Sequence, residues 1–140
     1  MKTFLKLVVP FVLLAAILVA ASCKKKQVYI GEPPTIAFKT GGNYYAANDT
    51  VTAGDTVLIG INATDNNSPD KLAQLVIRKK VNENDKETIK DIRIPEGQNT
   101  SYSADFKFVL LTEGTQVYTF IVTNTHGLQT EKTITFTVSQ

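Results

Sequence analysis

The segment SYSADFKFVL, residues 101–110, decides the fold of this chain. Apolar side chains occupy every second position from Tyr102 to Leu110, and serine, aspartate and lysine stand between them until Val109. Successive side chains of a β-strand point to opposite faces of a sheet, so this alternation indicates a strand with one buried face and one solvated face. Pro95-Glu96-Gly97 before it and Thr112-Glu113-Gly114-Thr115 after it are turn signals that set its limits.

The same two-residue period recurs on both sides of this segment. Apolar residues recur at every second position at Ile36 and Phe38, Val57 to Ala63, Leu75 and Ile77, Ile92 and Ile94, Tyr118 to Val122, and Ile134 to Val138. The segment 44–53 predicts a weak polar strand or a bend. Lys71 to Lys80 is the one alternative helix after residue 23, but its β-branched residues favour a strand. The pattern predicts an all-β sandwich of about seven mostly antiparallel strands over residues 35–140.

The first 23 residues have a different character. Lys2 and Lys6 precede an apolar run from Leu5 to Ala21, and Ala20-Ala21-Ser22 leads directly to Cys23, the only cysteine. This layout predicts a helical secretory signal peptide with a small-residue cleavage site. An uncleaved membrane helix is the alternative, although the run is slightly shorter than the roughly 20 residues that span a bilayer.

This N-terminal stretch resembles a bacterial lipoprotein signal, in which Cys23 becomes the acylated first residue of the mature chain. The family usually has leucine where this chain has Ala20, and relaxed versions ending in Ser-Cys resemble those of the Bacteroidetes. The resemblance implies a signal peptide over residues 1–22, a lipidated tether over 23–34 and a domain over 35–140. Lys24 in place of aspartate favours the outer membrane, and the absence of an acidic pair after Cys23 favours its periplasmic face.

The charge balance and the number of cysteines bear on two further properties, nucleic-acid binding and disulfide formation. The segment 1–22 contains two of the 15 basic residues and none of the 13 acidic ones, so the mature chain has 13 of each. A balanced chain without a clustered basic surface is not expected to bind nucleic acid. A single cysteine excludes an internal disulfide, so the domain depends on its core for stability.

The stretch from Gly114 to Gly127, followed by an alternating terminal strand, resembles the last hairpin of immunoglobulin-like, fibronectin type III-like and cadherin-like bacterial modules. The resemblance places Tyr118 at the tyrosine corner, whose hydroxyl bonds back to the backbone. A variable-type immunoglobulin domain is not expected, because the chain has no tryptophan and no cysteine pair. The whole chain is similar to small Bacteroidetes lipoproteins with one such domain.

Two groups of polar residues are candidates for a chemical site. His126 is the only histidine and lies among turn formers, so a structural role is expected, and no Gly-x-Ser-x-Gly motif supports a Ser-His-Asp triad. Asp65 and Asp70 offer oxygen ligands for Ca²⁺, as in cadherin-like modules, but Asn-Asn-Ser-Pro between them is ordinary turn chemistry. The sequence therefore predicts no metal and no cofactor, and Lys79-Lys80 is expected to form a solvated strand face.

Two further groups concern sugars. Tyr44 and Tyr45 follow Gly41-Gly42-Asn43 and form a candidate aromatic platform for a glycan or another partner, although one ring of an adjacent pair is expected to enter the core. The chain also resembles starch-utilisation lipoproteins, whose leading domains are immunoglobulin-like, and this resemblance slightly favours a sugar ligand. Thr50 and Thr56 stand in Asp-Thr-Val motifs that resemble the O-glycosylation motif of Bacteroidetes.

Together these resemblances imply a lipid-anchored, non-enzymatic immunoglobulin-like module of the cell envelope. Its role would be to bind, or to assist, a protein or glycan partner. The alternatives are an envelope spacer with no ligand and a hydrolase. The sequence leaves the partner and the oligomeric state open.

Overall fold

A computed structural model of the chain describes residues 31–67 and 69–140. The expected signal helix, Cys23 and most of the expected tether lie outside the described residues. Within the described part, no helix is both long and apolar enough to cross a membrane. The last tether residues lie against the domain, because Pro34 is buried and the carbonyl of Glu32 accepts a 3.2 Å hydrogen bond from Asn67 Nδ2.

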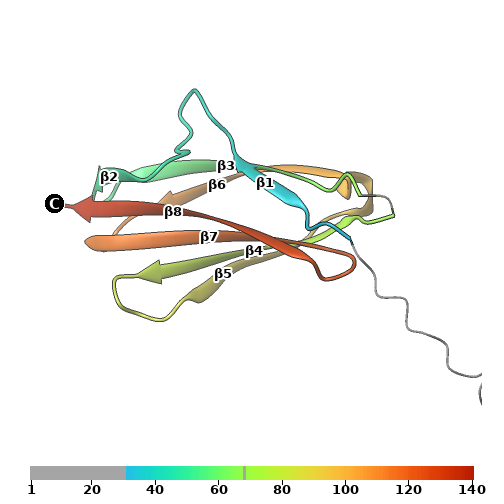
Figure 1. Cartoon of the computed structure of the whole chain (residues 1–140). Helices are drawn as coiled ribbons and strands as arrows, with labels where there is room; N and C mark the ends of the chain where they lie inside the picture. The colour runs from blue at the N-terminus through green and yellow to red at the C-terminus, as the bar shows by residue number, and fades with distance from the viewer. Residues whose placement is uncertain (1–30, 68) are drawn as a thin grey trace, which may run out of the picture. The chain divides into compact units, whose positions relative to one another are not determined.

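Eight strands form two sheets that pack face to face (Figure 1). One sheet has the order β1-β3-β6 and the other β2-β8-β7-β4-β5, and every pair is antiparallel except β2 and β8. The bounds are β1 Thr35–Phe38, β2 Asp49–Thr52, β3 Thr56–Thr64, β4 Leu72–Val81, β5 Glu87–Arg93, β6 Ser101–Val109, β7 Gly114–Asn124 and β8 Gln129–Ser139, with a short 3-10 helix, η1, at Glu96–Gln98.

This arrangement is immunoglobulin-like and confirms the expected fold class. The strands β3 and β6 share one sheet, while β4, β7 and β8 share the other, as do the B, E and C, F, G strands of that fold. The weak segment 44–53 supplies the eighth strand, β2, and the segment expected to be strand rather than helix forms β4 from Leu72 onward. The final hairpin, β7 and β8, pairs antiparallel as the resemblance implied.

The core lies between the sheets and follows the two-residue period. In β3, Val57, Ile59, Ile61 and Ala63 are all fully buried, as the alternation predicts. In β6, Phe106 is buried, and Tyr102, Ala104 and Phe108 on the same face are partly buried. The Phe120 ring connects the sheets, because its centroid lies 5.6 Å from that of Phe38 and 5.9 Å from that of Phe106.

The expected tyrosine corner takes a different form. The Tyr118 hydroxyl donates a 3.2 Å hydrogen bond to Gln116 Oε1, and Gln116 Nε2 donates a 2.6 Å bond to the carbonyl of Thr112. The tyrosine therefore reaches the backbone only through the Gln116 side chain, which is itself fully buried. Burial, together with the nearby Glu87 carboxylate, raises the pKa of Tyr118 to about 12.

Candidate functional site

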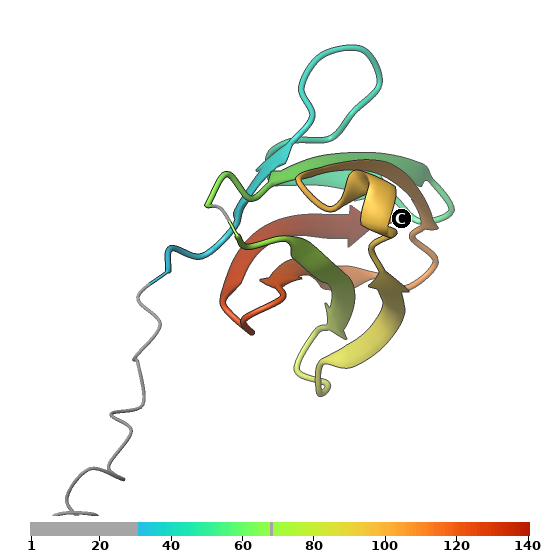
Figure 2. The same ribbon diagram turned by 90° about the vertical axis from the view of Figure 1, so that its right-hand side faces the viewer.

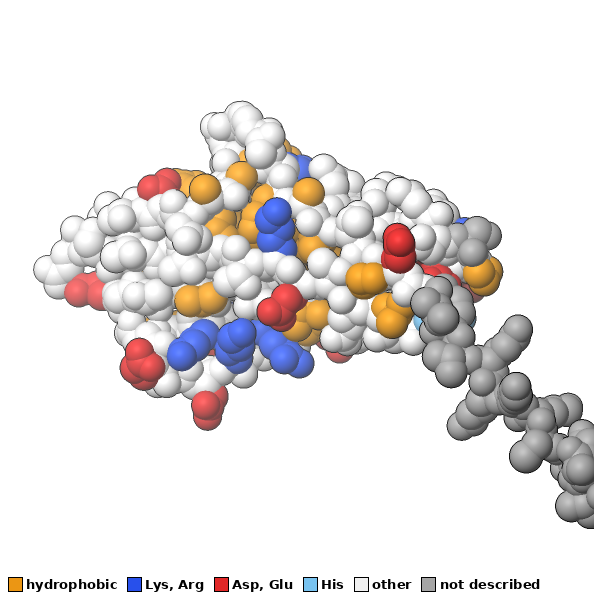
Figure 3. Space-filling model, in the orientation of Figure 1, with side chains coloured by type: hydrophobic (Ala, Val, Ile, Leu, Met, Phe, Trp, Pro, Cys, Tyr) orange, Lys and Arg blue, Asp and Glu red, His pale blue; other side chains and the backbone are white. Residues whose placement is uncertain are grey.

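The loop between β1 and β2, residues 39–48, projects from the sandwich (Figure 2 and Figure 3). Gly41 and Gly42 have φ values of +83° and +58°, a left-handed conformation that glycine adopts without a steric penalty. The chain then returns to the sheet, where the Tyr45 amide donates a 2.9 Å hydrogen bond to the carbonyl of Leu58. The loop therefore leaves the sheet after β1 and returns to it beside β3 at Tyr45.

Tyr44 fixes the base of this loop to β6. Its hydroxyl donates a 3.0 Å hydrogen bond to Asp105 Oδ2, while Lys39 Nζ lies 2.6 Å from Asp105 Oδ1. The Lys39 ammonium also lies 5.5 Å from the centroid of the Tyr44 ring, within the range of a cation–π interaction. The lysine lowers the pKa of Asp105, and the hydrogen-bonded carboxylate raises the pKa of Lys39. One carboxylate on β6 therefore holds both ends of the turn.

Gly60 makes room for this cluster. A Cβ atom at this position of β3 would lie 2.5 Å from Lys39 Cδ, 2.7 Å from Tyr44 Cε1 and 2.9 Å from Asp105 Oδ1. Gly60 pairs directly with Asp105 across the ladder, and the side chains of Lys39, Tyr44 and Asp105 meet over its backbone. A glycine inside a strand often marks such a close approach.

The second half of the loop contacts β8 of the five-stranded sheet. The Tyr45 ring packs edge-on against Phe136, with 5.5 Å between centroids, and belongs to the margin of the core. Asn48 Oδ1 accepts a 2.9 Å hydrogen bond from the backbone amide of Thr135 in β8. Tyr44 and Tyr45 therefore point to different sides, as strand geometry predicts, and they do not form one flat platform.

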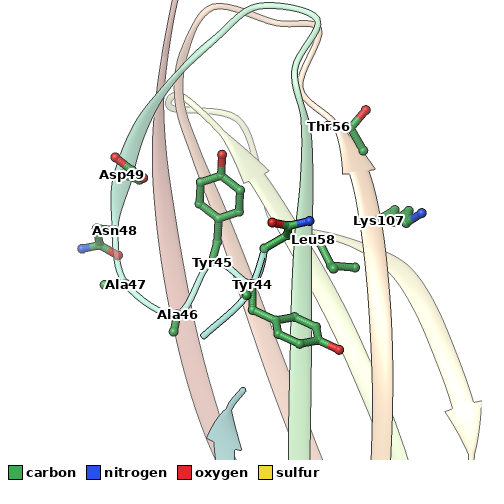
Figure 4. A pocket seen from close by; sticks show the side chains of 11 residues that line it. Tyr44, Tyr45, Ala46, Ala47, Asn48, Asp49, Thr56, Leu58 and Lys107 are labelled. Carbon is green, nitrogen blue, oxygen red and sulfur yellow. The ribbon is translucent and has the colours of Figure 1, made fainter. Parts of the chain in front are cut away.

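An open groove of about 800 Å³ lies between the loop and the outer face of β3 and β6 (Figure 4). The two tyrosines and Leu58 supply its apolar surface. Its polar surface comes from an ammonium, a carboxylate, two amides and a hydroxyl, namely those of Lys107, Asp49, Asn43, Asn48 and Thr56. We call this site the loop groove. Such a mixture of donors and acceptors beside aromatic rings suits a polar ligand with apolar faces.

The two candidate glycosylation threonines are both exposed. Thr50 lies in β2 and Thr56 begins β3, where it also lines the loop groove. The aspartates before them make local backbone contacts, since Asp49 Oδ1 accepts from the Thr50 amide and Asp55 Oδ2 from the Thr52 amide. Exposure leaves both hydroxyls accessible, and their modification stays a prediction.

The candidate calcium residues belong to a buried network at the opposite end of β3. Asp65 and Asp70 are 3% and 1% exposed, and Asn124 Nδ2 lies between them, 3.1 Å from Asp65 Oδ2 and 3.4 Å from Asp70 Oδ2. Asn124 Oδ1 accepts the amides of His126 and Leu128. An amide therefore occupies the position between the carboxylates that a cation would need. No group of three or more acidic, histidine or cysteine residues suited to a metal occurs among the residues described.

His126 completes this network from the β7–β8 turn. Its Nδ1 atom lies 2.7 Å from Asp70 Oδ1, and its side chain is 38% exposed. An aspartate at Nδ1 is also how hydrolytic triads orient their imidazole. The hydrolase alternative therefore rests on this pair, whereas the packing of the pair into a turn network agrees with the expected structural role.

Comparisons with known proteins add information about the fold alone. No protein-family model matches the chain, and no curated protein does. A superoxide reductase (neelaredoxin) from Ignicoccus hospitalis is similar with a TM-score of 0.54 and 11% identity, over 77% of this chain and 81% of that one. The CARDB domain of the PF1109 protein from Pyrococcus furiosus has a TM-score of 0.48 and 11% identity, over 81% and 100% of the two chains. Murine CRIg has a TM-score of 0.42 and 13% identity, over 78% and 100%.

Sequence reasoning missed most of what builds the loop groove. Lys39 and Asp105 lie 66 residues apart, and no local pattern connects them. Gly60 was the available signal, because a glycine inside a strand often marks the close approach of another segment. Asn124 is one of the turn formers around His126 in the sequence, and in the structure its amide joins the β7–β8 turn to the loop after β3.

Proposed function

We propose that this chain is a lipid-anchored, non-enzymatic module of the cell envelope whose immunoglobulin-like domain binds a glycan in the loop groove. One observation carries the proposal: the 39–48 loop is fixed at its base by Tyr44 and Asp105 and at its end by Asn48. A loop that is ordered before binding loses little conformational entropy when a ligand arrives. Binding residues are commonly displayed on such loops by a rigid scaffold.

The chemistry of the groove favours a glycan over an apolar ligand. Sugar hydroxyls both donate and accept hydrogen bonds, and Asn43, Asp49 and Lys107 supply partners of both kinds. The tyrosines and Leu58 offer surface for the C–H faces of sugar rings. Because the groove is open along the sheet, it suits a chain of several sugars better than a small enclosed metabolite.

A glycan array tests this proposal with the full chain in detergent. Asn43→Ala and Lys107→Ala remove exposed side chains from the groove, and Lys86→Ala is the matched control in an exposed turn remote from it. Binding that falls at least about tenfold in both groove variants and persists in the control supports the proposal. Wild-type protein that binds no glycan, or groove variants that bind normally, would contradict it and leave a spacer role.

The anchor is tested separately. Several acyl chains on Cys23 would hold the protein stably, since each buried CH₂ adds about 0.8 kcal/mol and one chain alone is marginal. Cells grown with a labelled fatty acid should label the wild-type chain and leave Cys23→Ala unlabelled. Protease treatment of intact cells should spare the protein if it faces the periplasm, and degradation would place it on the cell surface instead.

The Asp70–His126 pair justifies one test of the hydrolase alternative. His126→Gln removes the base and keeps a polar side chain in the turn. A non-enzymatic module predicts that any ester hydrolysis in a purified sample is the same for the two proteins. Hydrolysis that is lost in the variant, while its circular dichroism stays native, would replace the binding function with an enzymatic one.

A further inference from the structure

Among the described residues, the two sheets leave four strand edges without a neighbour, and three of them carry features that discourage pairing. The strands β1 and β2 contain four residues each. The strand β5 has a register shift opposite Ile77 and Arg78, and most of its side chains are exposed and polar or charged. Short strands, bulges and charges are the usual means by which proteins protect sheet edges.

The remaining edge, β6, lacks the first two of these features. It has nine residues, and all nine pair with β3 without a register shift. Of the two charges on its outer face, Asp105 is held by Lys39 on the β3 side. The structure thus presents one long, regular edge with its backbone groups available on the side facing away from β3.

A hollow of about 360 Å³ opens beside this edge, between β5 and β6. Aromatic rings form its floor, because the centroids of Phe108 and Tyr118 lie 4.6 Å apart, and Ile89 borders it from β5. Val109 and Leu111, at the end of β6 and just beyond it, are 51% and 74% exposed, and they are the only large apolar side chains that are exposed in the described part of the chain. The core is therefore incompletely covered at this margin.

The charge around the hollow is mostly positive. Lys79, Lys90 and Lys107 line it together with a single carboxylate, Glu87. Lys79 Nζ also lies 5.7 Å from the centroid of the Tyr118 ring. An occupant that brings acidic side chains would be attracted here, and one that brings lysines would be repelled.

We propose that the β6 edge binds an extended segment of a partner protein in which apolar and acidic side chains alternate. The segment adds a strand to the β1-β3-β6 sheet through backbone hydrogen bonds. Its apolar side chains cover Phe108 and Ile89, and its acidic side chains point to the opposite face, beside Lys107 and within the positive field of Lys79 and Lys90. A second copy of this chain fits less well, because its own β6 would bring another Lys107 to the same positive margin.

A defined peptide tests this proposal on the full chain in detergent, without a natural partner. The probe is a blocked peptide of alternating valine and glutamate, about as long as β6. Hydrogen exchange should slow at β6 amides when the peptide binds, and Lys90→Glu should weaken binding several-fold while Lys86→Glu leaves it unchanged. A valine–lysine peptide and a backbone N-methylated valine–glutamate peptide should both bind at least about tenfold more weakly.

Four outcomes would overturn it. These are no binding of the probe at millimolar concentration, equal binding of the lysine or N-methylated peptide, protection confined to strands other than β6, and unchanged affinity in Lys90→Glu. Protection of β6 that rises with protein concentration in the absence of peptide would show that a second copy occupies the edge, and would also contradict the proposal. The glycan proposal can fail independently of this one, because Asn43, which the array test also changes, lines the loop groove and not the hollow.

Discussion

The Tyr44 hydroxyl donates a 3.0 Å hydrogen bond to Asp105, which joins the projecting loop to the middle of an edge strand. This bond links the two surfaces to which we assign functions, because Asp105 stands on β6 and Tyr44 lines the loop groove. The anchoring side chains come from segments far apart in the sequence, so the groove exists only in the folded domain.

Gly60→Ala should loosen the loop groove. The added methyl group would meet Lys39, Tyr44 and Asp105 at 2.5–2.9 Å, so the anchoring cluster must move. Overpacking of this kind costs about 1–3 kcal/mol, and we expect that loss in chemical denaturation together with weaker glycan binding. Gly97→Ala is the matched control, because nothing lies within 4 Å of its added Cβ, and it should change stability by less than about 0.5 kcal/mol. Equal stability of the two variants would show that Lys39, Tyr44 and Asp105 can move to accommodate the methyl group without a loss of unfolding free energy.

Asn124→Asp should destabilise the domain near neutral pH. It replaces the amide between Asp65 and Asp70 with a third carboxylate in a buried site, where an unpaired charge costs roughly 3–5 kcal/mol. Asp65→Asn in the same chain restores an amide donor and should recover a large part of the loss. The unfolding free energies of the single and double variants measure this directly. A double variant no more stable than Asn124→Asp would show that charge repulsion is not the cause.

Tyr118 should make stability depend on pH in the alkaline range. Its pKa is about 12 in the folded chain and about 10 in an unfolded one, so between these values the unfolded state loses a proton that the folded state keeps. The unfolding free energy should therefore fall as pH rises from about 10 to 12, by of order 1–2 kcal/mol from this residue. Tyr118→Phe should have a shallower slope, whatever its stability at neutral pH. Parallel slopes would mean that the phenol is not protected from ionisation.

The sequence predicted the parts of the fold that depend on side-chain period. Alternation in β3, β6 and β8 identified both the strands and their buried faces, because a two-residue period arises where successive side chains point to opposite faces of a sheet. The β-branched residues of the 71–81 segment favoured a strand over a helix, and the segment forms β4. The strand β2 was weak in the sequence because only Val51 of its four residues is buried, and its parallel partner β8 lies more than 80 residues away.

The candidate sites were predicted less completely. Tyr44 and Tyr45 do line a groove, but a local pattern cannot show that Tyr45 packs on Phe136 while Tyr44 bonds to Asp105. Asp65 and Asp70 offer oxygen ligands for a cation, although the sequence predicted no metal, and the structure places the Asn124 amide between them. In each case the deciding partner comes from a distant strand, so it depends on the topology of the whole domain.

The most direct test of the central claim is an amide NMR titration of the full chain in detergent with the glycan that binds most strongly on the array. Binding in the loop groove predicts shift changes concentrated at residues 39–49, Thr56, Leu58 and Lys107, and the loss of these changes in Lys107→Ala. Shift changes confined to the outer face of the β2-β8-β7-β4-β5 sheet, or to the margin between β5 and β6, would contradict it.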